Sequence, residues 1–242
     1  MYLRAVHVER DEEALRQLIR DFPLGVLTTA IDLPDHDLLQ HTHVPWLLQQ
    51  ADSPNAGADA APQYWLEGHM ARANPHVKAL LAARAQGGSV PARQVSVLFT
   101  HAAESYITPK YYTTTKPASG KVVPTWNYAA AQVSGTLELD ESPAYLLRQT
   151  AALTDKHEAT QASRDGKPAW TVDEAPEEYI RALCKAIIGV RIRVEALQGK
   201  FKMNQEMPLG DRAGVVEGLR AIGMGEVADV VQQRSDLKER AA

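Results

Sequence analysis

Apolar and polar residues alternate over several short stretches of the chain, and a period of two is typical of strands with one buried face. The stretch "RQVSVLFTH" (93–101) shows this alternation, and "LGVLTTAID" (24–32) contains the β-branched residues that strands favour. Further strands are predicted at 37–48, 63–70, 123–140 and 189–205. The stretch 123–140 is either a strand pair or one bent strand with a bulge at Gly135, and the last strand is expected to break at Gly199.

A helical period of 3.6 residues predicts helices between and after these strands. Asn74 is a good N-cap for the helix at 74–85, and Pro75 suits its first position because its missing N–H is not needed there. The other predicted helices are 11–22, 142–156, 176–187 and one or two within 211–234. Strands dominate the first 140 residues without regular alternation with helices. The pattern therefore favours a mainly β (α+β) fold, a largely antiparallel barrel with inserted and appended helices.

Composition excludes several classes of protein. The 242 residues carry a formal net charge of −4, and the hydrophobic share of 45% and charged share of 23% are ordinary for a soluble protein. No apolar run approaches the ~20 residues of a membrane span, and the charged N-terminus does not look like a secretory signal. Cys184 is the only cysteine, so no intramolecular disulfide can form. A cytoplasmic protein without membrane partners is expected.

The negative charge does not favour direct DNA binding, which usually needs a basic face. A local basic patch stays open, because Arg191, Arg193, Lys200 and Lys202 lie close together in the sequence. The chain has no G-x-S-x-G, no G-x-G-x-x-G and no P-loop motif. Cys184 belongs to an apolar helical stripe with Leu183, Ile187 and Ile188, where it is expected to pack.

The stretch "EGHMARANPH" (67–76) has two interpretations. The N-terminus of a helix presents free N–H groups and a partial positive charge, and Arg72 just before it could add a bidentate contact to an anion. Alternatively, the stretch is only a capped turn with a surface arginine. Spacing alone favours the capped turn, since most capped helices bind nothing.

Histidines raise the question of a metal. His41 and His43 lie on one face of a predicted strand and could share a metal with a third ligand such as His69 or His101, but packing is the more favoured interpretation. The stretch "HEATQ" (157–161) lacks the second histidine of the zinc motif H-E-x-x-H. His157 is therefore expected to anchor the end of its helix or to reach a site on the barrel.

Two segments mix aromatic and polar residues, "SYITPKYY" (105–112) and "KVVPTWNY" (121–128). Such a mixture can line a pocket for a planar ligand, with rings for stacking and polar tips for orientation. The alternative is a pair of strands with ordinary buried aromatic side chains.

These segments occur together in one family, and the chain resembles the PaiB family of FMN-binding proteins, named as negative transcriptional regulators. The resemblance runs in order over nearly the whole chain, and its specific signatures are "ARANP" and "GKVVPTWNY". The other matching stretches are "MYLRAVHV", "LIRDFPLGVLTT", "HTHVPWLL", "SYITPKYY", "LTDKHEA", "AIIGVRIRVEALQGKFKMNQ" and "DRAGVVEGL".

The resemblance implies an FMN-binding split β-barrel, a single domain over 1–242 with a helical C-terminal segment at 206–242, and a homodimer with flavin at the interface. It places Arg72 and Asn74 near the flavin phosphate or ribityl chain, with Lys121 as a second cation. Trp126 and Tyr106 would flank the ring or the pocket wall, and His43 and His69 would supply hydrogen bonds. Thr125, within the second signature, is also expected to contact the cofactor.

One stretch departs from the family pattern. The last strand often ends in K-x-S-Q-N, whereas here Lys202 and Met203 are followed by Asn204, Gln205 and Glu206. If this strand end contacts the phosphate, Glu206 would cost about 1 kcal/mol or more near a surface.

The function that the resemblance implies is that of an FMN-dependent oxidoreductase or a flavin-based regulator. The alternatives are a transcriptional repressor that acts indirectly, a haem-binding or haem-degrading split barrel, and a metal-dependent oxygenase that uses His41 and His43.

Overall fold

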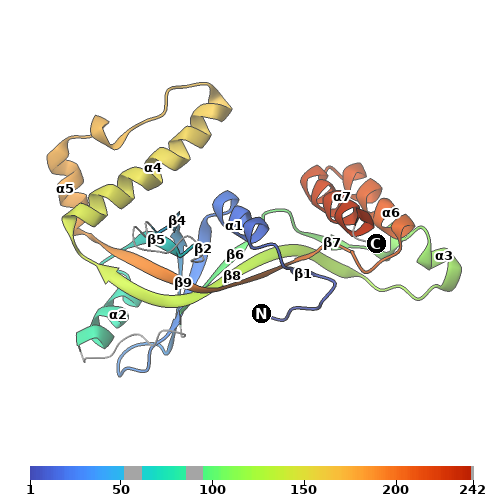
Figure 1. Ribbon diagram of the computed structural model, residues 1–242, viewed down its shortest axis with the longest axis horizontal. Helices are drawn as coiled ribbons and strands as arrows, with labels where there is room; N and C mark the ends of the chain where they lie inside the picture. Colours follow the sequence, from blue (N-terminus) through green and yellow to red (C-terminus); the bar gives the residue numbers. More distant parts are fainter. Residues whose placement is uncertain (52–61, 86–94, 241–242) are drawn as a thin grey trace. The chain divides into compact units, whose positions relative to one another are not determined.

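The computed structural model describes residues 1–51, 62–85 and 95–240 (Figure 1). The strands are β1 (Val8–Glu9), β2 (Leu24–Ala30), β3 (Leu39–Pro45), β4 (Leu47–Gln50), β5 (Tyr64–Ala71), β6 (Val95–Thr100), β7 (Ser105–Ile107), β8 (Thr125–Asp140) and β9 (Ile187–Lys202). The helices are α1 (Glu12–Asp21), α2 (Pro75–Ala85), α3 (Thr115–Ser119), α4 (Pro143–Asp165), α5 (Glu177–Lys185), α6 (Leu209–Ala221) and α7 (Gly225–Arg240), with 3-10 turns η1 (Pro109–Tyr111) and η2 (Val172–Glu174).

The chain divides into two compact units. Unit 1 comprises Met1–Leu18, Phe99–Gln132 and Gln198–Ala242, and unit 2 comprises Ile19–Leu98 and Val133–Leu197. The long strands β8 and β9 are therefore each divided between the two units. They are hydrogen-bonded neighbours and run side by side as two long ribbons in Figure 1.

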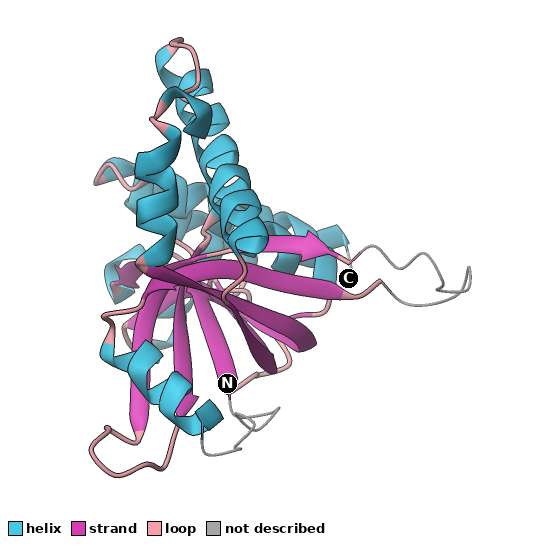
Figure 2. Cartoon of the chain, turned by 90° about the vertical axis from the view of Figure 1, so that its left-hand side faces the viewer, coloured by secondary structure: helices cyan, strands magenta, loops and turns pink. Residues whose placement is uncertain are grey.

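The predicted fold class is confirmed. The strand order is β3-β2-β6-β8-β9-β5-β4, and the pairings of β2 with β3 and β6, of β4 with β5, and of β5 with β9 are all antiparallel. Helices are inserted between the strands and follow them along the chain, and Figure 2 distinguishes the helices (cyan) from the strands (magenta). Period-two alternation produces this sheet because each strand turns one set of side chains to a core; in β6, for example, Val95, Val97 and Phe99 are buried.

In unit 2, α4 begins at a serine cap, where the Ser142 hydroxyl accepts a hydrogen bond from the Tyr145 backbone N–H at 3.3 Å. Tyr145 and Leu146 of α4 form an apolar cluster with Cys184 of α5, which Ile180 and Ile187 extend. The prediction that Cys184 packs in a helix is thus confirmed. Its predicted neighbour Leu183 instead points outward and is 47% exposed.

In unit 1, β7 pairs with β8, and α6 packs against α7 and against the 3-10 turn η1. Small residues on α6 make the contact with η1 possible. A Cβ on Gly214 would lie 2.2 Å from the Tyr111 carbonyl oxygen, and one on Gly218 would lie 2.3 Å from the Tyr111 ring. The tail predicted as one or two helices consists of two.

Several predicted boundaries are wrong for physical reasons. The strand 37–48 is two strands, β3 and β4, interrupted at the buried Trp46. The strand β9 passes Gly199 without a break, because the missing side chain admits the Leu15 side chain and the Ala130 carbonyl oxygen, which would lie 2.4 and 2.7 Å from a Cβ. The helix predicted to end near 156 continues to Asp165, where Gly166 stops it at φ 70°. His157 is therefore inside that helix and does not anchor its end.

Candidate functional site

One face of the sheet in unit 1 gathers aromatic and cationic side chains, and we call it the aromatic–basic face. It comprises Tyr106 of β7, Trp126 and Tyr128 of β8, and Lys200 and Lys202 of β9. The alternation of side chains along a strand separates this face from the core. Asn127 and Ala129, which lie between and beyond the β8 aromatics, are fully buried on the opposite side.

The two outer aromatic rings of this face are only half covered. Tyr106 is directly opposite Trp126 in the β7–β8 pair, and their ring centroids lie 6.3 Å apart at an interplanar angle of 65°. Trp126 is 49% exposed and Tyr106 is 51% exposed. Each ring therefore retains enough free surface to stack on a planar ligand.

The two lysines of this face are held by hydrogen bonds, and Lys200 also lies over a ring. The Lys202 ammonium donates to the Thr125 hydroxyl and, at 2.6 Å, to the Trp126 carbonyl oxygen. The Lys200 ammonium lies 4.8 Å from the centre of the Tyr128 ring and donates to the Tyr2 carbonyl oxygen at 3.2 Å. Burial lowers the pKa of Lys202. Within the described residues, no carboxylate lies within ion-pair distance of either ammonium.

Glu206 is the acidic neighbour of Lys202, but its carboxylate is turned towards His7. The Nε2 atom of the buried His7 lies 2.9 Å from Oε2 of Glu206. Burial alone would raise the pKa of Glu206, yet the hydrogen bond with His7 and the charge of Lys202 hold this pKa below its usual value. The carboxylate predicted to oppose a phosphate is thus partly neutralised by two basic groups.

A buried polar chain fixes the turn after β9. Asn127 donates to the Asn204 side-chain carbonyl at 2.7 Å, and Asn204 donates to the Tyr112 hydroxyl at 3.3 Å. Asn204 adopts φ 61°, a left-handed conformation that asparagine tolerates better than most residues. These contacts hold the segment that carries Glu206.

The predicted cofactor residues fall into both units. In unit 1, Thr125 and Trp126 contact Lys202, and Tyr106 packs against Trp126, as described above. Lys121 lies exposed in the loop before β8, where its backbone N–H donates to the Ser119 hydroxyl at 3.2 Å. Lys202 was not among the residues predicted to bind the cofactor. Its spacing of two from Lys200 could have indicated that both lysines lie on one face of a strand.

In unit 2, Arg72 and Asn74 already have partners. The Arg72 guanidinium donates to Glu141 Oε2 at 2.8 Å, and Arg84 binds the other carboxylate oxygen. The hydrogen bonds from Arg84 and Arg72 lower the pKa of Glu141. Asn74 caps α2 by accepting from the His76 backbone N–H at 2.9 Å. This stretch therefore has the capped-turn geometry, and its role in anion binding stays a prediction.

The histidines considered as metal ligands do not form a metal-binding cluster within the described residues. His43 is exposed on β3, and His41 on the same strand lies 3.0 Å from the Thr28 hydroxyl. His69 contacts the buried Gln149 at 2.7 Å, and the amide nitrogen of Gln149 has no hydrogen-bond partner within the described chain. No group of three or more metal-ligating side chains was found in the described ranges.

His76 is a buried residue that the sequence analysis did not identify. Its two ring nitrogens contact the hydroxyls of Thr29 at 2.8 Å and Thr42 at 2.9 Å, so it joins α2 to β2 and β3. Burial, followed by the charge of His41, lowers its pKa from 6.5 to about 4. The ring is therefore neutral at physiological pH and serves as a structural bridge.

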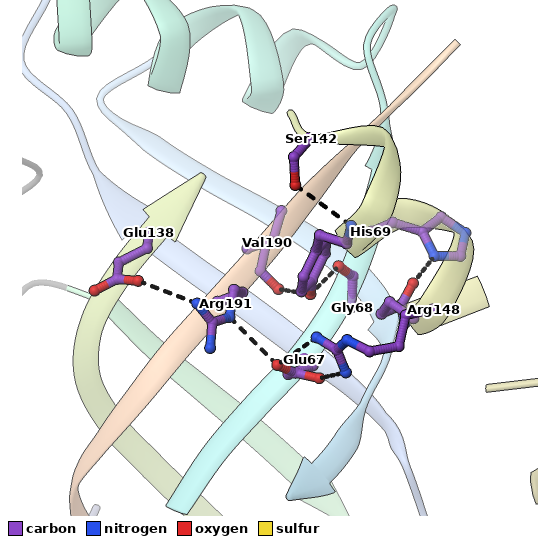
Figure 3. A network of polar contacts seen from close by, with 10 residues as sticks. Glu67, Gly68, His69, Glu138, Ser142, Arg148, Val190 and Arg191 are labelled. Carbon is purple, nitrogen blue, oxygen red and sulfur yellow. Dashed lines mark hydrogen bonds and ion pairs between the residues drawn. The ribbon is translucent and has the colours of Figure 1, made fainter. Parts of the chain in front are cut away.

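A polar network attaches α4 to the sheet of unit 2 (Figure 3). The buried carboxylate of Glu67 accepts two hydrogen bonds from Arg148, at 2.9 and 3.2 Å, and one from Arg191 at 3.3 Å. The Tyr145 hydroxyl donates to the Gly68 carbonyl oxygen at 3.2 Å. The first two turns of α4 are thus held on β5 and β9.

Comparison with known proteins identifies the class of this chain. The family described as "Putative FMN-binding domain" matches residues 1–196, and the chain belongs to it. The predicted family and its cofactor, FMN, are thereby confirmed.

Particular relatives extend over most of the chain. An uncharacterised protein of Aspergillus fumigatus is 45% identical and covers 99% of this chain and 100% of its own. The "Protease synthase and sporulation protein PAI 2" of Bacillus subtilis is 28% identical and covers 74% of this chain and 72% of its own. A conserved hypothetical protein of Mycobacterium tuberculosis with a solved structure is 15% identical, with a TM-score of 0.47 over 86% of this chain and 94% of its own. No helix in the described ranges is long and apolar enough to cross a membrane.

The aromatic–basic face fits the two chemical parts of FMN. The isoalloxazine ring is planar and suits the half-exposed rings of Trp126 and Tyr106. The phosphate is an anion and suits a lysine ammonium without a carboxylate partner, together with the Thr125 hydroxyl.

Proposed function

We propose that this protein is an FMN-dependent redox protein that holds the flavin on the aromatic–basic face. The observation that supports the proposal is that unit 1 carries two half-exposed aromatic rings in contact, Tyr106 and Trp126, and that the Lys202 ammonium is bound to the backbone carbonyl of Trp126. Bound FMN would supply hydride or electron transfer, which is the chemistry of the cofactor itself. The residues of the face would bind and orient it.

Lys202 is a better candidate for the phosphate than Arg72. The Arg72 guanidinium would have to exchange an existing ion pair with Glu141 for the phosphate. Lys202 donates its hydrogen bonds to a hydroxyl and a backbone carbonyl, which are neutral acceptors, and its acidic neighbour Glu206 is hydrogen-bonded to His7 instead. Its position next to Thr125 also provides a hydroxyl donor for a second phosphate oxygen.

The rings of Trp126 and Tyr106 would orient the isoalloxazine. The two rings meet edge to face and do not enclose a slot between them, so a flavin ring stacked on them would keep its other face free. We propose that a second copy of the chain covers part of this surface, as the resemblance to homodimeric split barrels implies. The exposed Val123, which precedes β8, extends the uncovered strip that such a copy would bury.

Flavin titration of substituted proteins tests this placement. In Lys202→Met, loss of one charge-assisted contact should weaken FMN binding by about 1.5–3 kcal/mol. Trp126→Ala should remove the stacking contribution, roughly 0.5–1.5 kcal/mol beyond the area lost. Matched controls are Lys167→Met and Trp170→Ala, which remove an exposed lysine and a 41% exposed tryptophan from unit 2. Unchanged affinity in both test variants, combined with loss of binding in Arg72→Ala, would move the cofactor to unit 2.

The redox role is tested separately. Anaerobic mixing of the FMN-loaded protein with NADH or NADPH should bleach the flavin absorption, and reoxidation by an added acceptor should restore it. A protein that binds FMN tightly but is reduced by neither donor would favour the alternative, a flavin-based regulator. A Soret band in the purified protein would instead favour the haem-binding alternative.

A further inference from the structure

A cavity of about 500 Å³ lies in unit 2 between α4, α5 and the turn that follows β5. Pro143, Leu146 and Leu147 of α4 and Cys184 of α5 form its apolar floor. Cationic side chains stand at its rim, namely Arg72, Arg181 and Lys185, with Glu141 as the one carboxylate in its lining. A volume of this size suits a small organic ligand.

The charges at this rim are unbalanced in favour of an anion. Glu141 is already occupied at both oxygens by Arg72 and Arg84, so it cannot also neutralise the other cations. Arg181 is paired with Glu177, but both side chains are largely exposed, and such surface pairs are weak. Lys185 has no ion-pair partner among the described residues.

The helix that carries most of this floor, α4, is held in place on the sheet. Tyr145, Arg148 and Gln149 are fixed to the sheet by the network in Figure 3, and they alternate along α4 with the residues that line the cavity. Leu146 is buried against Cys184, whereas Leu147 keeps 38% of its surface exposed towards solvent. A leucine held in this way gains from burial by an apolar ligand body.

We propose that this cavity binds a small monocarboxylate with an apolar body, such as a medium-chain or aryl carboxylic acid. The body would cover Leu146, Leu147 and Pro143, and the carboxylate would reach Arg181 and Lys185. This ligand site is separate from the flavin placement in unit 1 and does not depend on it.

Calorimetric titration with decanoate tests the proposal, and decanol serves as an uncharged probe with the same body. Decanoate should bind saturably, and decanol should bind at least about tenfold more weakly, because it lacks the charge-assisted contact. The double variant Arg181→Glu with Lys185→Glu should lose decanoate binding by a similar factor or more. The charge-matched control, Arg164→Glu with Lys167→Glu, reverses two exposed cations outside the cavity lining and should bind decanoate as the unsubstituted chain does.

Cys184 reports where the ligand binds, because it is the only thiol and lines the cavity. Decanoate should slow its reaction with the neutral reagent 4,4′-dithiodipyridine over the same concentration range that calorimetry gives. Equal binding of decanol and decanoate, or no decanoate binding at all, would overturn the proposal. If FMN rather than decanoate protects Cys184, both this site and the flavin placement are wrong. Protection by decanoate with unchanged FMN affinity in Lys202→Met would overturn only the flavin placement.

Discussion

Acid should destabilise this protein through His76, a residue far from the surface. The imidazole is 1% exposed and bridges the hydroxyls of Thr29 and Thr42, and its pKa in the folded chain is about 4 instead of 6.5. Protonation would place a charge in a site that offers it no counter-ion. The test therefore needs only a fall in pH from 7.5 to 5, and the sequence stays unchanged.

The sign and size of the effect follow from proton linkage. The folded pKa lies below the unfolded one, so the unfolded chain binds this proton first as the pH falls. The stability that the neutral ring provides is complete above about pH 6.5 and is progressively lost towards pH 4. Between pH 7.5 and pH 5 the linkage relation gives a loss of about 2 kcal/mol in the free energy of unfolding.

Urea unfolding at the two pH values, followed by tryptophan fluorescence, measures this loss. In His76→Gln the acid-dependent difference should shrink by about 2 kcal/mol, although the variant is less stable at both pH values. His36→Gln, in the turn before β3, is the control and should keep the full difference. The reasoning fails if the unsubstituted chain and His76→Gln lose the same free energy between pH 7.5 and pH 5.

Further expectations concern charge and close packing. Glu206→Gln should strengthen FMN binding by about 1 kcal/mol in a flavin titration, because it removes an anion beside Lys202. Gly135→Ala should lower the free energy of unfolding by about 1–3 kcal/mol, measured by urea denaturation, since a Cβ there would lie 1.9 Å from the Arg193 carbonyl oxygen. Glu67→Gln should lower the thermal midpoint, with a loss of about 1–3 kcal/mol, because two arginines lose their buried carboxylate partner.

The two stability expectations each have a matched control in the same chain. Gly225→Ala should leave the protein as stable or slightly more stable, because nothing lies within 4 Å of the added Cβ. Glu178→Gln removes an exposed carboxylate from α5 and should leave the thermal midpoint unchanged. A stronger effect of either control than of its test variant would contradict the assignment. Equal FMN affinity with and without Glu206 would show that its charge is fully compensated by His7.

Local patterns in the sequence were sufficient for most of the elements. The alternation in 93–101 and the cap at Asn74 depend only on neighbouring residues, and β6 and α2 lie where they were predicted within the described ranges. The wrong predictions concern the effect of a glycine in a strand and the length of a helix. Gly199 permits a close approach between β9 and its neighbours, which only the packed sheet reveals, and α4 extends past 156 because no helix-stopping residue occurs before Gly166.

The membership of the FMN-binding family was also evident from the sequence, because its motifs are stretches of consecutive residues. The grouping of side chains into sites was not. Trp126 and Lys202 are 76 positions apart, and His7 and Glu206 are 199 apart. Their meeting depends on strand register, and a shift of one residue would turn every side chain to the other face.

Arg72 is a further residue whose partner the sequence did not reveal. Its motif predicted an anion contact, and its guanidinium is paired with Glu141, which is 69 positions away. Sequence alone determined which residues are chemically capable of holding a phosphate. Only the tertiary structure decided which of them form a direct ion pair, as Arg72 does, because ion pairs form between groups that folding brings together and the sequence separates.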